Sequence, residues 1–182
     1  MAPMVATSED VELVHEIVGE AFAGLDASRI ARAPRLEVGI MVEVPSAALC
    51  APELAGRVAF FSIGSNDLTQ YVMAMDRTNS RLASIADGLH PSVLRAIRAT
   101  VEGAATAGIP VAVCGEMAGD VMLTRLLLGF GLRQFSMHPA NLLEIKQQVL
   151  KSELARLEQL ANRILRVEDP QKALQLLDKL NA

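Results

Sequence analysis

The sequence predicts an α/β fold built on a parallel sheet, and two observations support this prediction. Short apolar runs alternate with longer amphipathic segments along the chain, and within each run the apolar residues are consecutive rather than at every second position. Strands that are buried on both faces have this continuous pattern, and they occur in parallel sheets covered by helices. A doubly wound sheet and a (β/α) barrel both fit this order of elements.

The expected elements follow one another from the N-terminus. Strands are expected at residues 3–7, 36–44, 58–64, 109–117 and 134–137, with helices from residue 8, near 46–54, near 68–76, and at 90–108 and 119–131. Local signals support them, since Pro91 suits the first turn of the helix that Gly108 ends. The chain from Pro139 onward reads as helix. We therefore expect a first part at residues 1–140 and a helical tail of the same domain at 141–182.

Composition limits the classes of function. The chain has 182 residues, of which 51% are hydrophobic, enough for one compact domain with a sizeable core. The net charge is -4 and no Lys/Arg stripe is interleaved with aromatic residues, which argues against nucleic-acid binding. The apolar runs are too short to span a bilayer, so we expect no membrane association and a cytoplasmic location. Two cysteines without a disulfide-rich pattern fit a reducing compartment.

Polar side chains follow the expected strands where each strand ends. These residues are Glu43, Asn66, Asp67, Cys114 and Glu116. Doubly wound sheets and barrels both place their active sites at the carboxyl ends of their strands. Because several strands contribute single residues here, the pattern favours the barrel.

Glu43 and Asp67 end two strands that are adjacent in the sequence. Neighbouring parallel strands lie about 5 Å apart, so the two carboxylates would repel each other unless a cation lay between them. A hard divalent ion such as Mg²⁺, completed by water and a ligand oxygen, is the simplest such cation. The alternative is that each carboxylate caps a helix N-terminus, and spacing alone leaves both interpretations open.

Three further residues have a functional and a structural interpretation. Asn66 could donate a hydrogen bond to a ligand oxyanion or could stabilise a turn. Arg77 could return to the same site through a loop or could pair with a nearby acid such as Asp76. Cys114 precedes a glycine at a strand end, where a proton donor is plausible, although buried inert cysteines are commoner. Cys50 is expected to serve packing within a helix.

Four ordered blocks of the sequence, from about Pro3 to Met137, together resemble one family. They are similar to the C-terminal, phosphoenolpyruvate-binding domain of Enzyme I, the phosphoenolpyruvate-protein phosphotransferase of the bacterial sugar phosphotransferase system. The blocks are "GIMVEVPSAAL", "FFSIGSNDLTQYVMAMDRTN", "LHPSVLRAI" and "VCGEMAGD". Phosphoenolpyruvate synthases and pyruvate phosphate dikinases share "NDLTQ", whereas "DRTN" and "CGEMAGD" are more similar to Enzyme I.

The resemblance implies a role for each of the five residues. Glu43 and Asp67 would hold Mg²⁺, which bridges to the phosphate and carboxylate of phosphoenolpyruvate. Asn66 and Arg77 would bind the phosphate, and Cys114 would protonate the methylene carbon of the enolate to give pyruvate. These roles agree with the chemistry, because phosphoryl transfer needs charge neutralisation, and the planar fork of arginine matches phosphate oxygens.

The resemblance also implies a TIM barrel, of which this chain supplies a part. Met1 to Thr7 aligns with about the fourth of eight strands, so we expect a partial (β/α)8 barrel of about strands 4 to 8 with C-terminal helices. Five strands cannot close such a barrel. The family's N-terminal half, which carries the phosphorylatable histidine and docks the phosphocarrier protein, has no counterpart in this sequence, and neither do two phosphate-binding arginines of the first strands.

Three hypotheses of function follow from these observations. The first is the phosphoenolpyruvate-binding part of a phosphotransferase, which would not transfer a phosphoryl group alone and would reach its phosphocarrier through the missing half. The second is a non-catalytic module that binds phosphoenolpyruvate. The third is a Mg²⁺-dependent lyase that acts on pyruvate enolates. The resemblance further implies a homodimer.

Overall fold

The computed structural model describes residues 1–75, 88–167 and 169–181, and it confirms the α/β class. The strands β1 (Ile40–Val42), β2 (Phe61–Gly64), β3 (Val111–Cys114) and β4 (Gln134–Phe135) form one parallel sheet in the order β1-β2-β3-β4. A doubly wound sheet reverses its strand order at a switch point. The four strands described here run in sequence order without such a reversal.

The prediction of a strand at residues 3–7 is wrong, because no strand forms there, and the backbone explains why. The N-terminal segment joins the edge of the sheet through a single parallel bridge between Ala2 and Ile40. Pro3, the next residue, has no N–H group to donate to a ladder. Met4 then adopts a left-handed conformation with φ 55°, which is incompatible with an extended strand, so the chain cannot continue along the sheet edge.

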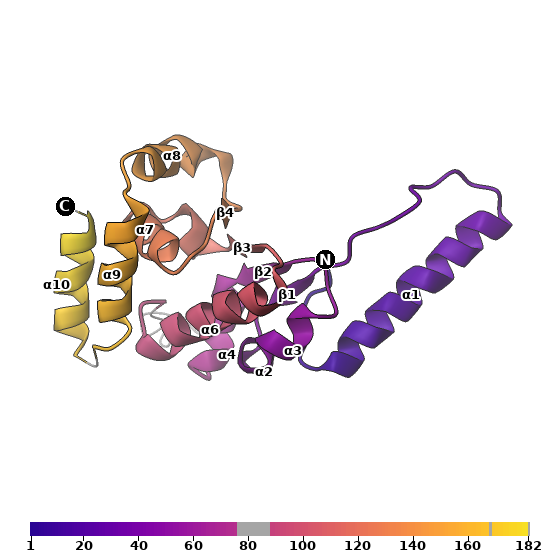
Figure 1. The fold of residues 1–182 in the computed structure, drawn as a ribbon, viewed down its shortest axis with the longest axis horizontal. Helices are drawn as coiled ribbons and strands as arrows, with labels where there is room; N and C mark the ends of the chain where they lie inside the picture. Colours follow the sequence, from indigo (N-terminus) through magenta and orange to yellow (C-terminus); the bar gives the residue numbers. More distant parts are fainter. Residues whose placement is uncertain (76–87, 168, 182) are drawn as a thin grey trace.

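Helices surround the sheet unevenly (Figure 1). Their bounds are α1 Ser8–Ala27, α2 Pro45–Leu49, α3 Ala51–Ala55, α4 Ser65–Val72, α6 Pro91–Ala107, α7 Val121–Gly129, α8 Leu142–Leu150, α9 Leu154–Ile164 and α10 Pro170–Asn181, with short 3-10 turns η1 Glu116–Gly119 and η2 Pro139–Asn141. The helices α2, α3, α4 and α6 gather below the sheet in Figure 1, while α7 to α10 stand at one end and α1 extends at the other. No helix among the described residues is long and apolar enough to cross a membrane.

The helix termini follow local chemistry. Thr7 is the N-cap of α1 and forms a capping box with Asp10, one residue before the expected start at Ser8. The backbone N–H groups of Ala6 and Thr7 donate to the Asp10 carboxylate and hold its pKa below the usual range. The expected boundaries of α6 are confirmed, with Pro91 at its first turn and Gly108 left-handed at its end.

The two faces of the sheet have different surroundings, because side chains alternate between the faces along each strand. One face packs in the core beneath the helices, where Ile40, Val42, Phe61, Ile63 and Val113 are fully buried and Val111 and Phe135 are partly buried. The other face ranges from buried at Ser62 to exposed at Gln134 and consists of Met41, Ser62, Ala112 and Gln134. We call these the core face and the open face.

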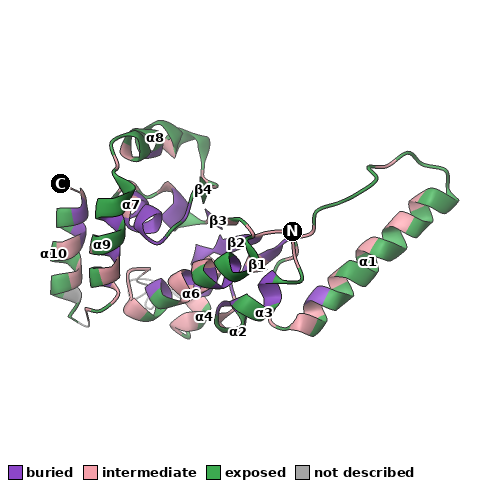
Figure 2. Cartoon of the chain, viewed as in Figure 1, coloured by how far each residue is buried: buried purple, intermediate pink, exposed green. Residues whose placement is uncertain are grey.

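The helix α1 is largely exposed, in contrast to the sheet (Figure 2). Val11 is its only buried residue in the structure as described. The loop after α1 folds back on its last turns, where Arg32 stacks 4.0 Å above the Phe22 ring and pairs with Asp26 at 2.6 Å. This side chain therefore ties the loop to the end of the helix.

Candidate active site

The residues at the carboxyl ends of the four strands lie in a row along one edge of the sheet. Gly64 pairs with Cys114 in the β2–β3 register, and Glu43 follows Val42, which pairs with Ile63. Ser136 follows β4, and its amide donates to the carbonyl oxygen of Val113 at 2.8 Å. The sheet thus brings residues from four strands to one edge, as the sequence predicted for the first three.

The first residue of this row, Glu43, is a buried carboxylate with 3% of its surface exposed. Its Oε1 accepts a hydrogen bond of 2.7 Å from the Met4 amide, 39 residues earlier in the chain. Its Oε2 lies over Gly64, where a Cβ atom would come within 2.6 Å of that oxygen. A glycine is therefore required at the tip of β2, and the N-terminal turn fixes the carboxylate above it.

The segment after β2 enters α4 directly, so the expected helix start near residue 68 is late. Ser65, Asn66 and Asp67 form the first turn of α4, whose N-cap is Gly64. The acid in this turn is favourable because the helix dipole is positive there. Neither Asp67 nor Glu43 is an N-cap residue, since Val44 occupies that position in α2. The helix-capping interpretation of the two carboxylates is thus wrong.

The side chain of Asn66 joins α4 to the loop after β3. Its Oδ1 accepts a hydrogen bond of 3.0 Å from the Glu116 amide. A backbone N–H can only donate, so the atom that faces it must be the oxygen. The NH₂ group is consequently the part of the amide that remains to meet a ligand.

A second link between α4 and β3 comes from Ser65. Its hydroxyl donates to the Cys114 carbonyl oxygen at 2.7 Å. Gly115, the next residue, has a left-handed φ of 85°, and a Cβ there would lie 2.5 Å from the Ser65 hydroxyl and 2.8 Å from Asn66 Oδ1. Glycine meets both requirements, a positive φ and the absence of a side chain, so that α4 and the β3 loop approach closely.

The thiol of Cys114 lies among hydrogen-bonding groups and is partly exposed. Its Sγ is 3.4 Å from the Ile63 carbonyl oxygen, to which it donates, and 3.7 Å from the Ser62 hydroxyl, from which it accepts. Both contacts come from β2, so that strand fixes the position of the thiol at the end of β3.

A cavity of 410 Å³ opens at these strand ends. It is lined by Asn66, Cys114, Gly115, Glu116, Gly119, Ser136, Met137, His138 and Asn141. Its size falls within the range of pockets that bind small molecules. Asn66 and Cys114, which belong to different strand ends, therefore both border one cavity.

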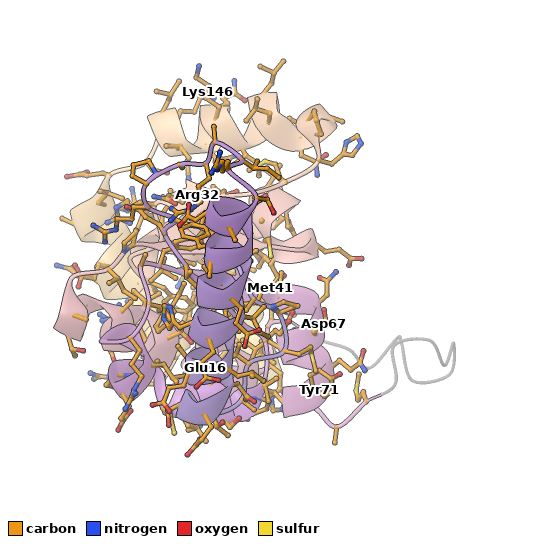
Figure 3. The ribbon with its side chains drawn as sticks, turned by 90° about the vertical axis from the view of Figure 1, so that its right-hand side faces the viewer. Glu16, Arg32, Met41, Asp67, Tyr71 and Lys146 are labelled. Atoms are coloured by element: carbon orange, nitrogen blue, oxygen red, sulfur yellow. The ribbon has the colours of Figure 1, made fainter. Side chains whose placement is uncertain are left out.

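The predicted site residues are brought together only in part. Asn66 and Cys114 line one cavity, whereas Glu43, at the tip of β1, and Asp67, in the first turn of α4, are not among its lining residues. In Figure 3, Asp67 is seen on α4 one turn before Tyr71. Arg77 lies outside the described residues. Within the described ranges no group of three or more His, Cys, Asp or Glu side chains forms a metal centre.

The carboxylates nonetheless have the chemistry of magnesium ligands. Glu43 has one oxygen engaged by the Met4 amide and the other directed over the strand tip, and Asp67 is half-buried in the adjacent turn. Mg²⁺ prefers a few carboxylate oxygens, with water and substrate oxygens completing its shell. Glu43 and Asp67 therefore supply oxygen donors of the type that Mg²⁺ takes.

Sequence reasoning missed several residues around the cavity. Ser65 could have been found from its place at the start of the "SNDLTQ" helix, and Gly115 from the glycine after Cys114. Asn141 gave no local signal, since its Nδ2 donates to the Gly119 carbonyl oxygen from 22 residues away. His138 reaches the cavity while its Nδ1 caps the 3-10 turn η2. Contacts over such distances depend on the tertiary fold.

Comparison with known proteins agrees with this geometry. Residues 1–154 match the model of the family described as PEP-utilising enzyme, PEP-binding domain. The chain is similar to the phosphoenolpyruvate-protein phosphotransferase of Cupriavidus necator (44% identity over 99% of this chain and 31% of the relative) and to that of Borreliella burgdorferi (41%, over 98% and 31%). A multiphosphoryl transfer protein of Rhodobacter capsulatus is 46% identical over 91% of the chain and 19% of the relative. The chain thus spans about a third or less of the length of these relatives.

Proposed function

The chain belongs to the family of PEP-binding domains of PEP-utilising enzymes, and from this premise we propose that it is the phosphoenolpyruvate-binding part of a phosphotransferase. The observation that carries the proposal is the cavity at the strand ends. Asn66 and Cys114 both line it, and Asn66 keeps its NH₂ group for a ligand because its Oδ1 is bonded to the Glu116 amide. An amide that can donate to an anion, close to a thiol that can give a proton to a carbon atom, suits a substrate that is the phosphate ester of an enol.

In the proposed reaction the phosphoryl group leaves phosphoenolpyruvate for a histidine of the complete enzyme and passes on to a phosphocarrier protein. The bond from phosphorus to the enol oxygen breaks, and the electron pair stays on the enolate. Cys114 gives its proton to the methylene carbon, which yields pyruvate. Asn66 and Arg77 hold the phosphate, since amide and guanidinium groups donate to phosphate oxygens. The receiving histidine would lie in another part of the longer enzyme, so we expect no phosphoryl transfer by these 182 residues alone.

Glu43 and Asp67 would hold Mg²⁺ in this proposal. The ion would supply charge neutralisation at the phosphate and at the departing enolate. The protein's own part is to fix the carboxylates, which it does for Glu43 through the Met4 amide and the close approach of Gly64. A side chain at position 64 would disturb this arrangement, because its Cβ would collide with the Glu43 carboxylate.

The arrangement of the rest of the protein is also part of the proposal. A parallel sheet whose strands follow sequence order is what a segment of a (β/α)8 barrel would contain. The barrel would be completed by strands of the longer enzyme, whose N-terminal part would meet the phosphocarrier. Residues 1–140 would form the barrel part and 141–182 its helical tail. The assembled enzyme would be a cytoplasmic homodimer.

Calorimetric titration of phosphoenolpyruvate, with and without Mg²⁺, tests the proposal. The chain should bind in a Mg²⁺-dependent manner, and Glu43→Gln should lose most of that dependence. Glutamine keeps an oxygen for the Met4 amide, so it removes the charge and leaves that hydrogen bond in place. Glu144→Gln, on the exposed side of α8, is the matched control and should bind normally.

Two outcomes would count against the proposal. A folded chain that does not bind phosphoenolpyruvate would show that the strand-end cavity is not its site in this chain. Equal binding by Glu43→Gln and the parent chain would exclude Glu43 as a magnesium ligand. Circular dichroism of each variant would establish that the helices remain intact.

A further inference from the structure

A second cavity, also of 410 Å³, lies at the surface between α9 and α10 and includes the turn that joins them. It is far along the chain from the strand ends. Its lining consists of Arg163, Arg166, Val167, Lys172, Gln175, Leu176 and Lys179. We call it the hairpin pocket. Four of its seven residues are cationic and none is acidic, although the chain as a whole has a net charge of -4.

Helical spacing produces this concentration of charge. On α10 the lining residues recur at three- and four-residue intervals from Lys172 to Lys179, so they share one face of the helix. Arg163 lies in the last turn of α9, and Arg166 and Val167 follow in the turn after it. Val167 and Leu176 are half-buried, which gives the pocket an apolar floor between its cations.

The four cations have no anionic partner in the part of the chain that the structure describes. Elsewhere Arg32, Arg57 and Arg98 each pair with a carboxylate at 2.6 to 2.7 Å. Among the nearby acids, Glu168 lies outside the described residues, the Oδ1 of Asp169 accepts from the Gln171 amide, and the exposed Asp178 on α10 is outside the lining. Four clustered like charges repel one another unless a counter-charge joins them.

The walls of the pocket are held in place from behind. Arg125 of α7 donates to the Leu180 carbonyl oxygen at 3.0 Å, and Asn181 donates to the Met122 carbonyl oxygen at 2.9 Å. Leu177 and Leu180 of α10 are buried in the main core. These contacts fix the backbone of α10, while the four cationic side chains are exposed and accessible to a ligand.

We propose that the hairpin pocket binds a phosphorylated small molecule, with its phosphate groups on the cations and its apolar part on Val167 and Leu176. The guanidinium groups of Arg163 and Arg166 match phosphate oxygens in pairs, and the two lysines add point charges. The volume suits a small molecule. This site is separate from the strand-end cavity, and the proposal does not depend on the proposed function.

Two-dimensional ¹⁵N NMR of the 182-residue chain, titrated with pyrophosphate and separately with a sugar bisphosphate, tests this inference. Amide shifts should cluster at the residues that line the hairpin pocket. The double variant Arg163→Gln/Lys172→Gln should bind about fivefold more weakly, because it removes two exposed charges, and exposed ion pairs contribute only modestly each. Both residues are exposed and without ion-pair partners among the described residues, so the fold should persist.

Lys146→Gln/Lys151→Gln on and just after α8 removes the same charge from an exposed place outside the pocket and is the matched control (Figure 3 shows Lys146). Its affinity should be unchanged. An equal loss of affinity in this control would show that net charge alone causes the effect, and it would overturn the proposal. Shifts spread over the surface, or confined to the strand ends, would also overturn it. Tighter binding of a glutamate-rich peptide than of the bisphosphate would assign the pocket to a polypeptide instead.

Discussion

The core face and the open face of the sheet are made by alternate residues of the same strands, yet they serve different purposes. Phe61 and Ile63 point into the helix-covered core and are fully buried, whereas Ser62, between them, directs its hydroxyl to the Cys114 thiol. The chemistry-bearing tips, Glu43 and Cys114, continue the open face. One face therefore supplies stability, and the other carries the polar side chains of the proposed site.

The largest effect should come from the core face. Phe61→Ala should lower the free energy of unfolding by about 3–5 kcal/mol, because it removes a large ring from a fully buried position and leaves a cavity. Gln134→Ala, on the exposed end of the open face, should change it by less than about 0.5 kcal/mol. Urea denaturation followed by circular dichroism measures both. Similar losses in the two variants would break the comparison.

Gly64→Ala should have an intermediate effect at the point where the open face reaches the site. The added Cβ would stand 2.6 Å from Glu43 Oε2, so the buried carboxylate must move. We expect a loss of about 1–3 kcal/mol in stability, as for other overpacked sites, together with loss of Mg²⁺-dependent phosphoenolpyruvate binding. Gly56→Ala is the control, since a Cβ there would meet no atom within 4 Å. Normal binding by Gly64→Ala would show that Glu43 need not lie over this glycine.

Bound ligand should protect one thiol from alkylation, which is a smaller effect. The alkylation rates should therefore differ between the two cysteines. Phosphoenolpyruvate with Mg²⁺ at ten times its Kd should slow the alkylation of Cys114 by about tenfold, because about a tenth of the sites remain free. Cys50 is exposed between α2 and α3 and should react at an unchanged rate. Mass spectrometry of the alkylated peptides reads both rates at once. Protection of both cysteines, or of neither, would contradict the assignment of Cys114 to the site.

The smallest effect is expected at Ser62. Ser62→Ala removes one weak hydrogen bond to sulfur and should cost no more than about 1 kcal/mol in stability. Its consequence should appear instead in the alkylation rate of Cys114, which the hydroxyl helps to hold in place. Thr106→Ala, at an exposed hydroxyl on α6, is a suitable comparison for the loss of a hydroxyl alone. An unchanged Cys114 rate in Ser62→Ala would remove Ser62 from the positioning of the thiol.

The sequence by itself determined the α/β class and the identity of the strand-end residues. Continuous apolar runs predict buried parallel strands, and polar residues directly after such runs must lie at the sheet's carboxyl edge, because parallel strands all end there. Glu43, Asn66, Asp67 and Cys114 were found in this way. The helix limits at Pro91 and Gly108 were also predictable, since their backbone preferences act within a single turn.

Only the tertiary structure decided how these residues are held. The hydrogen bond from the Met4 amide to Glu43 joins residues 39 positions apart, and that from the Glu116 amide to Asn66 joins residues 50 positions apart. No local sequence pattern predicts either of them. The first of them also explains the missing strand at residues 3–7, because Met4 leaves the sheet to reach the carboxylate. Local preference and periodicity act over a few residues, whereas a site depends on contacts between segments that become neighbours only when the chain packs.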